Sequence, residues 1–207
     1  MNVIKRRILL FGCQKIALDV MDFIRNYNEA IGVTKVGDIV TAELVGVITQ
    51  DEERDRLFSN ISVSEYCNDN NIPNIRFDGK IDEGVIGTFS PDIIFSIYYR
   101  RLLSKNVISV PKLGVVNLHP AKLPEDRGPN PTYWSVRRGD LAGFTTLHYI
   151  DEGMDTGDII ATKSTQIRGL SGFDTNKKMM NLGLELFKEN YENIMCEKNG
   201  REKQFHD

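Results

Sequence analysis

The feature that most constrains the fold is a repeated alternation of short apolar runs with stretches of helical periodicity. A strand is predicted over residues 7–11, closed by Gly12, and apolar residues then recur at helical spacing from Ile16 to Tyr27. The alternation continues along the chain, with further strands predicted over 44–48, 75–77, 93–97 and 115–118 and further helices over 63–70 and about 102–108. Strands that alternate with helices indicate parallel βαβ units, so the sequence predicts a doubly wound sheet.

The later part of the sequence predicts a different strand arrangement. The run GFTTLHYI is rich in β-branched and aromatic residues, and a second strand over 158–167 follows the turn at 153–157. The close spacing of these two strands predicts an antiparallel pair. A short helix over about 132–138 precedes them, and an amphipathic helix over about 174–195 follows. The predicted fold class is therefore α/β: a doubly wound, mostly parallel, Rossmann-like sheet with an antiparallel extension and a C-terminal helix.

The length and composition predict one domain of ordinary size rather than several. The 207 residues are 41% hydrophobic and 27% charged, a balance that can bury a core. We expect the domain to cover residues 1–200 and to be followed by a polar tail over 201–207, with fraying from Glu197 onward. The apolar stripe of the terminal helix indicates core packing, and a homodimer through that helix is an option that the sequence leaves open.

Charge and cysteine content exclude several classes of protein. The 26 Lys and Arg residues and 29 Asp and Glu residues give a net charge of −3, which offers no basic footprint for nucleic acid or an anionic membrane. No export signal and no run of 18 apolar residues is visible, so the prediction is a cytoplasmic protein with a small-molecule partner. The three cysteines form neither a disulfide framework nor a metal knuckle and are expected to be reduced and buried.

Common cofactor motifs do not occur. The turn FGCQKIAL lacks the second and third glycines of the dinucleotide fingerprint GxGxxG, so a nicotinamide cofactor is not supported. There is no GxxxxGK[ST] phosphate loop, and the three histidines lack the ligand spacing of known metal motifs. The sequence therefore predicts no metal cofactor.

Polar residues at the end of one predicted strand are the first candidates for chemistry. Asn117 and His119 lie two residues apart where that strand ends, so strand alternation points them to the same side. An amide donor and an imidazole around one substrate atom suit acyl transfer, in which an oxyanion develops. Asp155, in the turn DEGMDTGD between the two later strands, is the third candidate. His148 lies within the predicted strand GFTTLHYI and is interpreted as structural. Taken alone, an Asn-x-His pair is also typical of a purely structural pair.

Two longer motifs resemble one family. The stretch NLHPAKLPEDRGPNPTYW and the later HYIDEGMDTGDI, with Asp155 placed 38 residues after Asn117, resemble the formyltransferases that use 10-formyltetrahydrofolate. The resemblance is close from about Ile93 to Ile160 and is only a compatible βαβ pattern before that. It implies that Asn117 and His119 hold the formyl carbonyl while an amine attacks, and that Asp155 orients His119 and helps to move a proton through water.

The same resemblance implies binding residues for the two substrates. The folate would be held largely by main-chain groups of two loops, which contain Tyr99, Arg101, Leu103, Asp151 and Glu152. For Arg101, a solvated charge is an equal alternative. The acceptor would contact Arg127, Tyr133 and Trp134, for which a surface charge and helix packing are the alternatives.

The acceptor is predicted from differences between branches of that family. Glycinamide ribonucleotide formyltransferases have a G-x-G-S-N phosphate turn that FGCQKIALD lacks, and methionyl-tRNA formyltransferases carry a further C-terminal domain for tRNA. The segments SIYYRRLLS and RGPNPTYW look most like sugar N-formyltransferases. The expected reaction is formyl transfer to the amine of a nucleotide-linked amino sugar. The alternatives are a formyltransferase for glycinamide ribonucleotide or methionyl-tRNA and a non-catalytic folate-binding protein.

Overall fold

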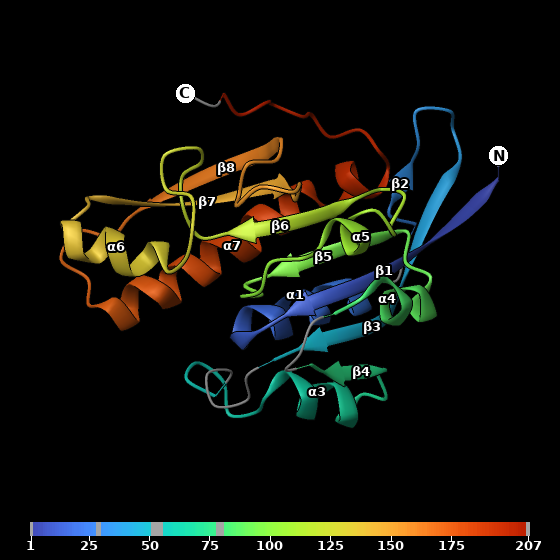
Figure 1. Ribbon diagram of the computed structural model, residues 1–207, viewed down its shortest axis with the longest axis horizontal. Helices are drawn as coiled ribbons and strands as arrows, with labels where there is room; N and C mark the ends of the chain where they lie inside the picture. The colour runs from blue at the N-terminus through green and yellow to red at the C-terminus, as the bar shows by residue number, and fades with distance from the viewer. Residues whose placement is uncertain (1, 28–29, 51–55, 78–80, 206–207) are drawn as a thin grey trace.

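A mixed β-sheet runs through the middle of the molecule in the computed structural model, which describes residues 2–27, 30–50, 56–77 and 81–205 (Figure 1). Its neighbouring strands follow the order β2-β3-β1-β5-β6-β7-β8, and β4 pairs with β3. The strands are β1 (Val3–Gly12), β2 (Gly32–Val33), β3 (Ile39–Thr49), β4 (Asn74–Arg76), β5 (Ile93–Ile97), β6 (Val115–His119), β7 (Ala142–Tyr149) and β8 (Ile159–Gln166). β4, β3, β1, β5 and β6 run parallel, whereas β6–β7 and β7–β8 pair antiparallel. The predicted parallel sheet with an antiparallel extension is confirmed.

Helices cover both faces of this sheet, which confirms the doubly wound arrangement. They are α1 (Gln14–Asn26), α3 (Val63–Asp69), α4 (Glu83–Phe89), α5 (Lys105–Ile108), α6 (Pro131–Arg138) and α7 (Gly172–Met195). α1, α3 and α7 pack their apolar side chains on one face, and α4 and α5 pack on the other. β5 is buried at all five positions because it lies between these two layers.

Local hydrogen bonds explain where several helices begin. Ser62 and Glu65 form a capping box at the start of α3. The Ser104 hydroxyl accepts a hydrogen bond from the backbone N–H of Val107, so α5 begins at Lys105. The predicted start of this helix, at about residue 102, is therefore wrong by three residues. α4 and β2 are not predicted from the sequence. α4 buries only Ile86, which leaves no apolar periodicity to detect, and β2 is two residues long.

Most apolar side chains of α7 pack in the core of the same chain. Its largest side chains are buried against the sheet and α1, and they include Met179, Leu186, Phe187, Tyr191 and Ile194. Phe187 and Tyr191 also stack edge-on or tilted against Phe95 of β5. Most of the apolar stripe is therefore used in the core, while Phe173 near the start of α7 stays 56% exposed, and the homodimer stays a prediction. The three cysteines are buried, as expected, and the cysteine side chains of the described residues form no disulfide.

The segment after α7 returns to the sheet. Glu202 forms an antiparallel bridge with Ile159 of β8, and the side chain of Gln204 is buried. The expected fraying from Glu197 onward is therefore wrong for the described residues, while residues 206–207 of the predicted tail lie outside them. None of the helices in the described ranges combines the length and apolarity needed to cross a bilayer.

Candidate active site

The last residues of β6 carry the first two polar groups of the site. Val116 and Leu118 pack on the face covered by α1 and α7, so alternation turns Asn117 and His119 to the opposite face. The strand pairing places Asn117 directly across from His148 of β7. Asn117 is half-buried and His119 is buried. The predicted common side for Asn117 and His119 is therefore confirmed.

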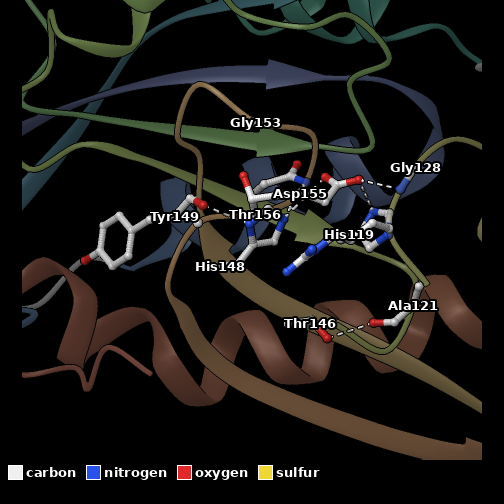
Figure 2. Close-up of polar contacts among 12 residues, drawn as sticks. His119, Ala121, Gly128, Thr146, His148, Tyr149, Gly153, Asp155 and Thr156 are labelled. Atoms are coloured by element: carbon white, nitrogen blue, oxygen red, sulfur yellow. Dashed lines mark hydrogen bonds and ion pairs between the residues drawn. The ribbon is translucent and has the colours of Figure 1, made fainter. Parts of the chain in front are cut away.

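Asp155 reaches this pair from the loop between β7 and β8 (Figure 2). Its Oδ2 atom lies 3.8 Å from Nδ1 of His119 and accepts a hydrogen bond from the backbone N–H of Gly128 at 2.9 Å. The Asp155 side chain is 17% exposed, so solvent reaches the carboxylate only in part. The structure thus brings together the carboxylate and the imidazole that the sequence places 36 residues apart.

His148, for which the sequence predicts only a structural role, is a fourth member of this group. Its Nε2 atom lies 3.1 Å from the amide nitrogen of Asn117 and 3.6 Å from Oδ1 of Asp155. Its Nδ1 atom lies 2.8 Å from the carbonyl oxygen of Tyr149. The purely structural role is therefore too narrow. Only the register of β6 against β7 reveals this contact, and no local motif in the sequence encodes it.

The protonation state of His148 follows from its surroundings. Burial lowers its pKa from 6.5 to about 4, so the ring is neutral at pH 7. A carbonyl oxygen only accepts, so Nδ1 carries the hydrogen and Nε2 carries the lone pair. The Asn117 amide nitrogen then donates to Nε2, which fixes the amide orientation and leaves its second N–H for a substrate oxygen.

The ring of His119 is held at its other nitrogen. Nε2 lies 3.0 Å from the carbonyl oxygen of Asp126, so Nε2 carries a hydrogen and Nδ1 faces the Asp155 carboxylate. Two threonines of β7 anchor the chain that leaves β6: Thr145 donates to the His119 carbonyl at 3.2 Å, and Thr146 donates to the Ala121 carbonyl at 2.7 Å. The loop that carries Asp126 and Gly128 is therefore tied to the sheet at its base.

The loop that carries Asp155 is shaped by its own polar groups. Asp151 accepts the backbone N–H of Gly153 at 3.0 Å and the hydroxyl of Thr156 at 2.5 Å. Asp155 adopts a left-handed backbone with φ 54°, a conformation that Asp tolerates better than most residues. Asp151 thus contributes its carboxylate to the turn that presents Asp155.

The two predicted folate loops lie against each other. Glu152 forms an ion pair with Lys105 at 2.6 Å, and Lys105 follows directly on the segment that contains Tyr99, Arg101 and Leu103. The Tyr99 ring packs on Phe11 with centroids 5.0 Å apart, and Leu103 packs in the same apolar cluster. Arg101 is exposed.

These groups fit a flat aromatic ligand with a polar edge. The Tyr99 hydroxyl is buried and has no hydrogen-bond partner among the described residues, and burial raises the pKa of that group well above its usual range. The segment from Tyr98 to Leu103 forms neither helix nor strand, so its peptide groups do not take part in the regular hydrogen bonds of a helix or sheet. The binding roles of both loops stay predictions.

The predicted acceptor residues are Arg127, which precedes Gly128, and two aromatic residues in the first turn of α6. Arg127 directs Nε and Nη2 to the side chain of Gln204, at 3.1 and 2.8 Å. Tyr133 and Trp134 begin α6, contact each other edge-on and remain 55% and 50% exposed. The alternative in which these rings serve as core packing is wrong, because Thr132 is the buried residue of that helix. Their role toward a substrate stays a prediction.

Fold and site together define a class: an α/β enzyme whose amide, imidazole and carboxylate groups meet beyond the carboxyl end of a central strand, where such sheets bind ligands. Sequence comparison agrees with that class and narrows it. Residues 14–192 match the formyl transferase family, and the chain belongs to that family.

Individual relatives give more detail. The methionyl-tRNA formyltransferase of Clostridioides difficile (strain 630) is 33% identical over 156 residues, which is 71% of this chain and 50% of that protein. The chain thus spans about half the length of the relative it matches. Among solved structures, a glycinamide ribonucleotide transformylase from Symbiobacterium toebii matches with a TM-score of 0.76 at 15% identity, over 98% of this chain and 95% of that one.

A second solved structure is that of a sugar N-formyltransferase. WlaRD, described as a sugar 3N-formyl transferase in the presence of dTDP and 5-N-formyl-THF, matches with a TM-score of 0.71 and 22% identity. The match covers 97% of this chain and 67% of that protein. At these identities the structural likenesses establish the fold, and they confirm the predicted fold class.

Proposed function

We propose that this protein transfers a formyl group from 10-formyltetrahydrofolate to the primary amine of a nucleotide-linked amino sugar. The observation that carries the proposal is the meeting of Asn117, His119 and Asp155, with the Asp155 carboxylate 3.8 Å from the His119 ring. A non-catalytic folate-binding protein would have no need for an amide donor, an imidazole and a carboxylate around one point.

The reaction forms a bond between the amine nitrogen and the formyl carbon and breaks the bond from that carbon to N10 of the folate. The amine loses one proton and N10 gains one. Asn117 donates its second N–H to the formyl oxygen as negative charge develops there, because its first N–H is held by His148 at 3.1 Å. The second donor is the Nε2–H group of His119, whose nitrogen lies 3.0 Å from the Asp126 carbonyl before substrate binds and would exchange that partner for the formyl oxygen.

His119 and Asp155 together transfer the proton from the amine to N10 of the folate. Nδ1 of His119 faces the Asp155 carboxylate, so a proton taken up there forms an imidazolium beside a negative charge. This pair receives the amine's proton through water and returns it to N10. The partial exposure of the Asp155 side chain provides the route for that water.

The donor is proposed from the two paired loops and from the relatives. The Lys105–Glu152 ion pair links the loop after β5 to the loop after β7, and we propose that these two loops are walls of the folate site. The apolar packing of Tyr99 and Leu103 suits a ring system, and main-chain groups supply its polar contacts. A solved relative with formyl-THF has this fold, which supports the choice of a folate donor.

The acceptor has two supported candidates. The exposed aromatic pair on α6 and the net charge of −3 favour a nucleotide sugar over a polyanionic RNA. The 33% identity to a methionyl-tRNA formyltransferase favours methionyl-tRNA. We propose the amino sugar because it explains the aromatic side chains beside the Arg127 loop.

An acceptor panel tests this choice. The purified chain is incubated with 10-formyltetrahydrofolate and, separately, with dTDP- and UDP-linked amino sugars, glycinamide ribonucleotide and methionyl-tRNA, and the N-formyl product is measured by mass spectrometry. We expect product with an amino-sugar nucleotide. Product only with methionyl-tRNA or glycinamide ribonucleotide would overturn the sugar assignment. Folate binding without product from any amine would overturn the catalytic assignment.

A variant test addresses the mechanism. His119→Ala should reduce kcat by roughly 100-fold or more while folate affinity stays within a factor of a few. Val36→Ala, at a position 83% exposed and near β2, is the matched control and should behave like the wild type. Near-normal turnover by His119→Ala contradicts the mechanism.

A further inference from the structure

Gln204 spans the two loops that make up the candidate site. Its Nε2 atom donates to the backbone carbonyls of Asp155 at 3.0 Å and Gly157 at 2.7 Å. Its Oε1 atom accepts from Nε and Nη2 of Arg127 at 3.1 and 2.8 Å. A primary amide has two N–H donors and two acceptor sites, so the side chain uses all of its hydrogen-bonding capacity on these loops.

These contacts connect Gln204 to the Asp155 carboxylate by two routes. Gln204 binds the backbone of Asp155, and the Asp155 side chain accepts the N–H of Gly128 at 2.9 Å. Gly128 follows Arg127 in the chain, and the Arg127 side chain returns to Gln204. The position of the carboxylate is therefore held at its backbone by Gln204 and at its oxygen by Gly128, whose neighbour Arg127 is bound by the same Gln204 amide.

The segment that carries Gln204 is itself anchored. Glu202 and Ile159 exchange two backbone hydrogen bonds of 2.8 Å, and the Arg201 guanidinium lies 3.7 Å from the centre of the Tyr149 ring. Gln204 is 8% exposed. Because these contacts hold the segment in place, the side chain presents its amide with little further loss of conformational freedom.

We propose that Gln204 is a positioning residue that keeps the Asp155 carboxylate in register with His119, so that the segment after α7 governs the activity of the site. The inference rests on the proposed formyl transfer for its kinetic readout. It assigns a role to a part of the chain that lies far from the catalytic residues in sequence and touches no reacting atom.

Two substitutions separate this role from simple stability. Gln204→Met keeps the length of the side chain and removes all four hydrogen bonds. Gln204→Glu keeps an acceptor for Arg127 and loses the N–H groups that bind the Asp155 and Gly157 carbonyls. Phe205→Ala, at a neighbouring position 86% exposed, is the control.

The kinetic expectation is a loss in kcat. Both Gln204 variants should lose roughly 10- to 100-fold in kcat, because a small displacement of a catalytic group has effects of this size, while KM for the folate changes by less than about threefold. Phe205→Ala should match the wild type. A Gln204→Glu enzyme with wild-type kcat would overturn the proposal, since the lost donors would then be irrelevant.

A second readout does not depend on catalysis. The N–H of Gly128 is protected from hydrogen exchange by the Asp155 carboxylate, so both Gln204 variants should exchange this amide faster than the wild type at equal global stability. Unchanged exchange in folded Gln204→Met, or in Gln204→Glu if the first variant does not fold, overturns the proposal. If the wild type formylates no acceptor, the proposed function fails, and the exchange measurement still decides the role of Gln204.

Discussion

The amide nitrogen of Asn117 lies 3.1 Å from Nε2 of His148, at the facing position of the neighbouring antiparallel strand. Because His148 is neutral and its Nδ1 hydrogen is held by the Tyr149 carbonyl, Nε2 has only a lone pair to offer. The Asn117 side chain therefore has one preferred orientation before any substrate binds. Preorganised donors of this kind are the groups that stabilise a developing oxyanion most effectively.

Replacing Asn117 should therefore affect turnover more than binding. Asn117→Ala removes one donor to the formyl oxygen, and loss of such a donor lowers kcat by about 100- to 1,000-fold. Folate affinity, measured by titration calorimetry, should change by less than about threefold, since the contact strengthens only in the transition state. A variant that loses folate affinity but keeps kcat would show that Asn117 serves binding instead.

The buried His148 makes stability depend on pH. Burial lowers its pKa from 6.5 to about 4 in the folded chain, so the unfolded chain binds the proton more tightly. The free energy of unfolding is therefore unaffected by this group above about pH 6.5 and falls as the pH drops from 6.5 to 4, by roughly 3 kcal/mol. His148→Gln, which cannot titrate, should show a correspondingly shallower fall when urea unfolding is measured between pH 7.5 and 4.5. Equal slopes for the two proteins would contradict the burial of a neutral ring.

Gly157 should not tolerate a larger side chain. A Cβ atom there would lie 2.0 Å from the Tyr149 carbonyl oxygen, so the backbone next to Asp155 would have to move. We expect Gly157→Ala to cost about 1–3 kcal/mol in urea unfolding and to lower kcat through the displaced carboxylate. Gly172→Ala, which meets nothing within 4 Å at the start of α7, is the control and should be neutral or slightly stabilising. A Gly157→Ala protein with wild-type stability and kcat would contradict this prediction.

The Lys105–Glu152 ion pair should affect KM for 10-formyltetrahydrofolate and have little effect on the free energy of unfolding. Its side chains are 74% and 66% exposed, and solvent screening leaves such exposed pairs little effect on stability. Glu152→Lys should raise KM for 10-formyltetrahydrofolate at low salt by like-charge repulsion between the two loops, with unchanged kcat. The double exchange Lys105→Glu with Glu152→Lys should restore KM. If the double variant is no better than the single one, the pairing of these loops does not influence the donor.

Much of the fold could be predicted because its signals are local. The predicted strand over 93–97 matches β5, and the periodicity from Ile16 to Tyr27 lies within one residue of the end of α1. α5 was predicted too long because the apolar residues Leu102 and Leu103 belong to an irregular segment that Ser104 separates from the helix. Hydrophobic periodicity records only where apolar residues lie in the sequence, and Leu102 is 76% exposed in the structure.

The candidate site could be predicted only in part. Asn117 and His119 share a face because alternation is a property of any strand, and the resemblance of DEGMDTGD to a family motif led to Asp155. His148 was assigned a structural role because a histidine within a strand carries no local signal. Gln204 was placed in a fraying tail because polar residues after a helix usually fray.

The sequence by itself determined the alternating elements, the direction in which β6 points Asn117 and His119, and the motifs that mark the family. Those properties depend on neighbouring residues and on the geometry of a single strand. Only the tertiary structure decided that His148 faces Asn117 and that Gln204 binds both loops around Asp155. Such contacts are set by strand register and by the return of the chain to the sheet, which result from the packing of the whole molecule rather than from any local pattern.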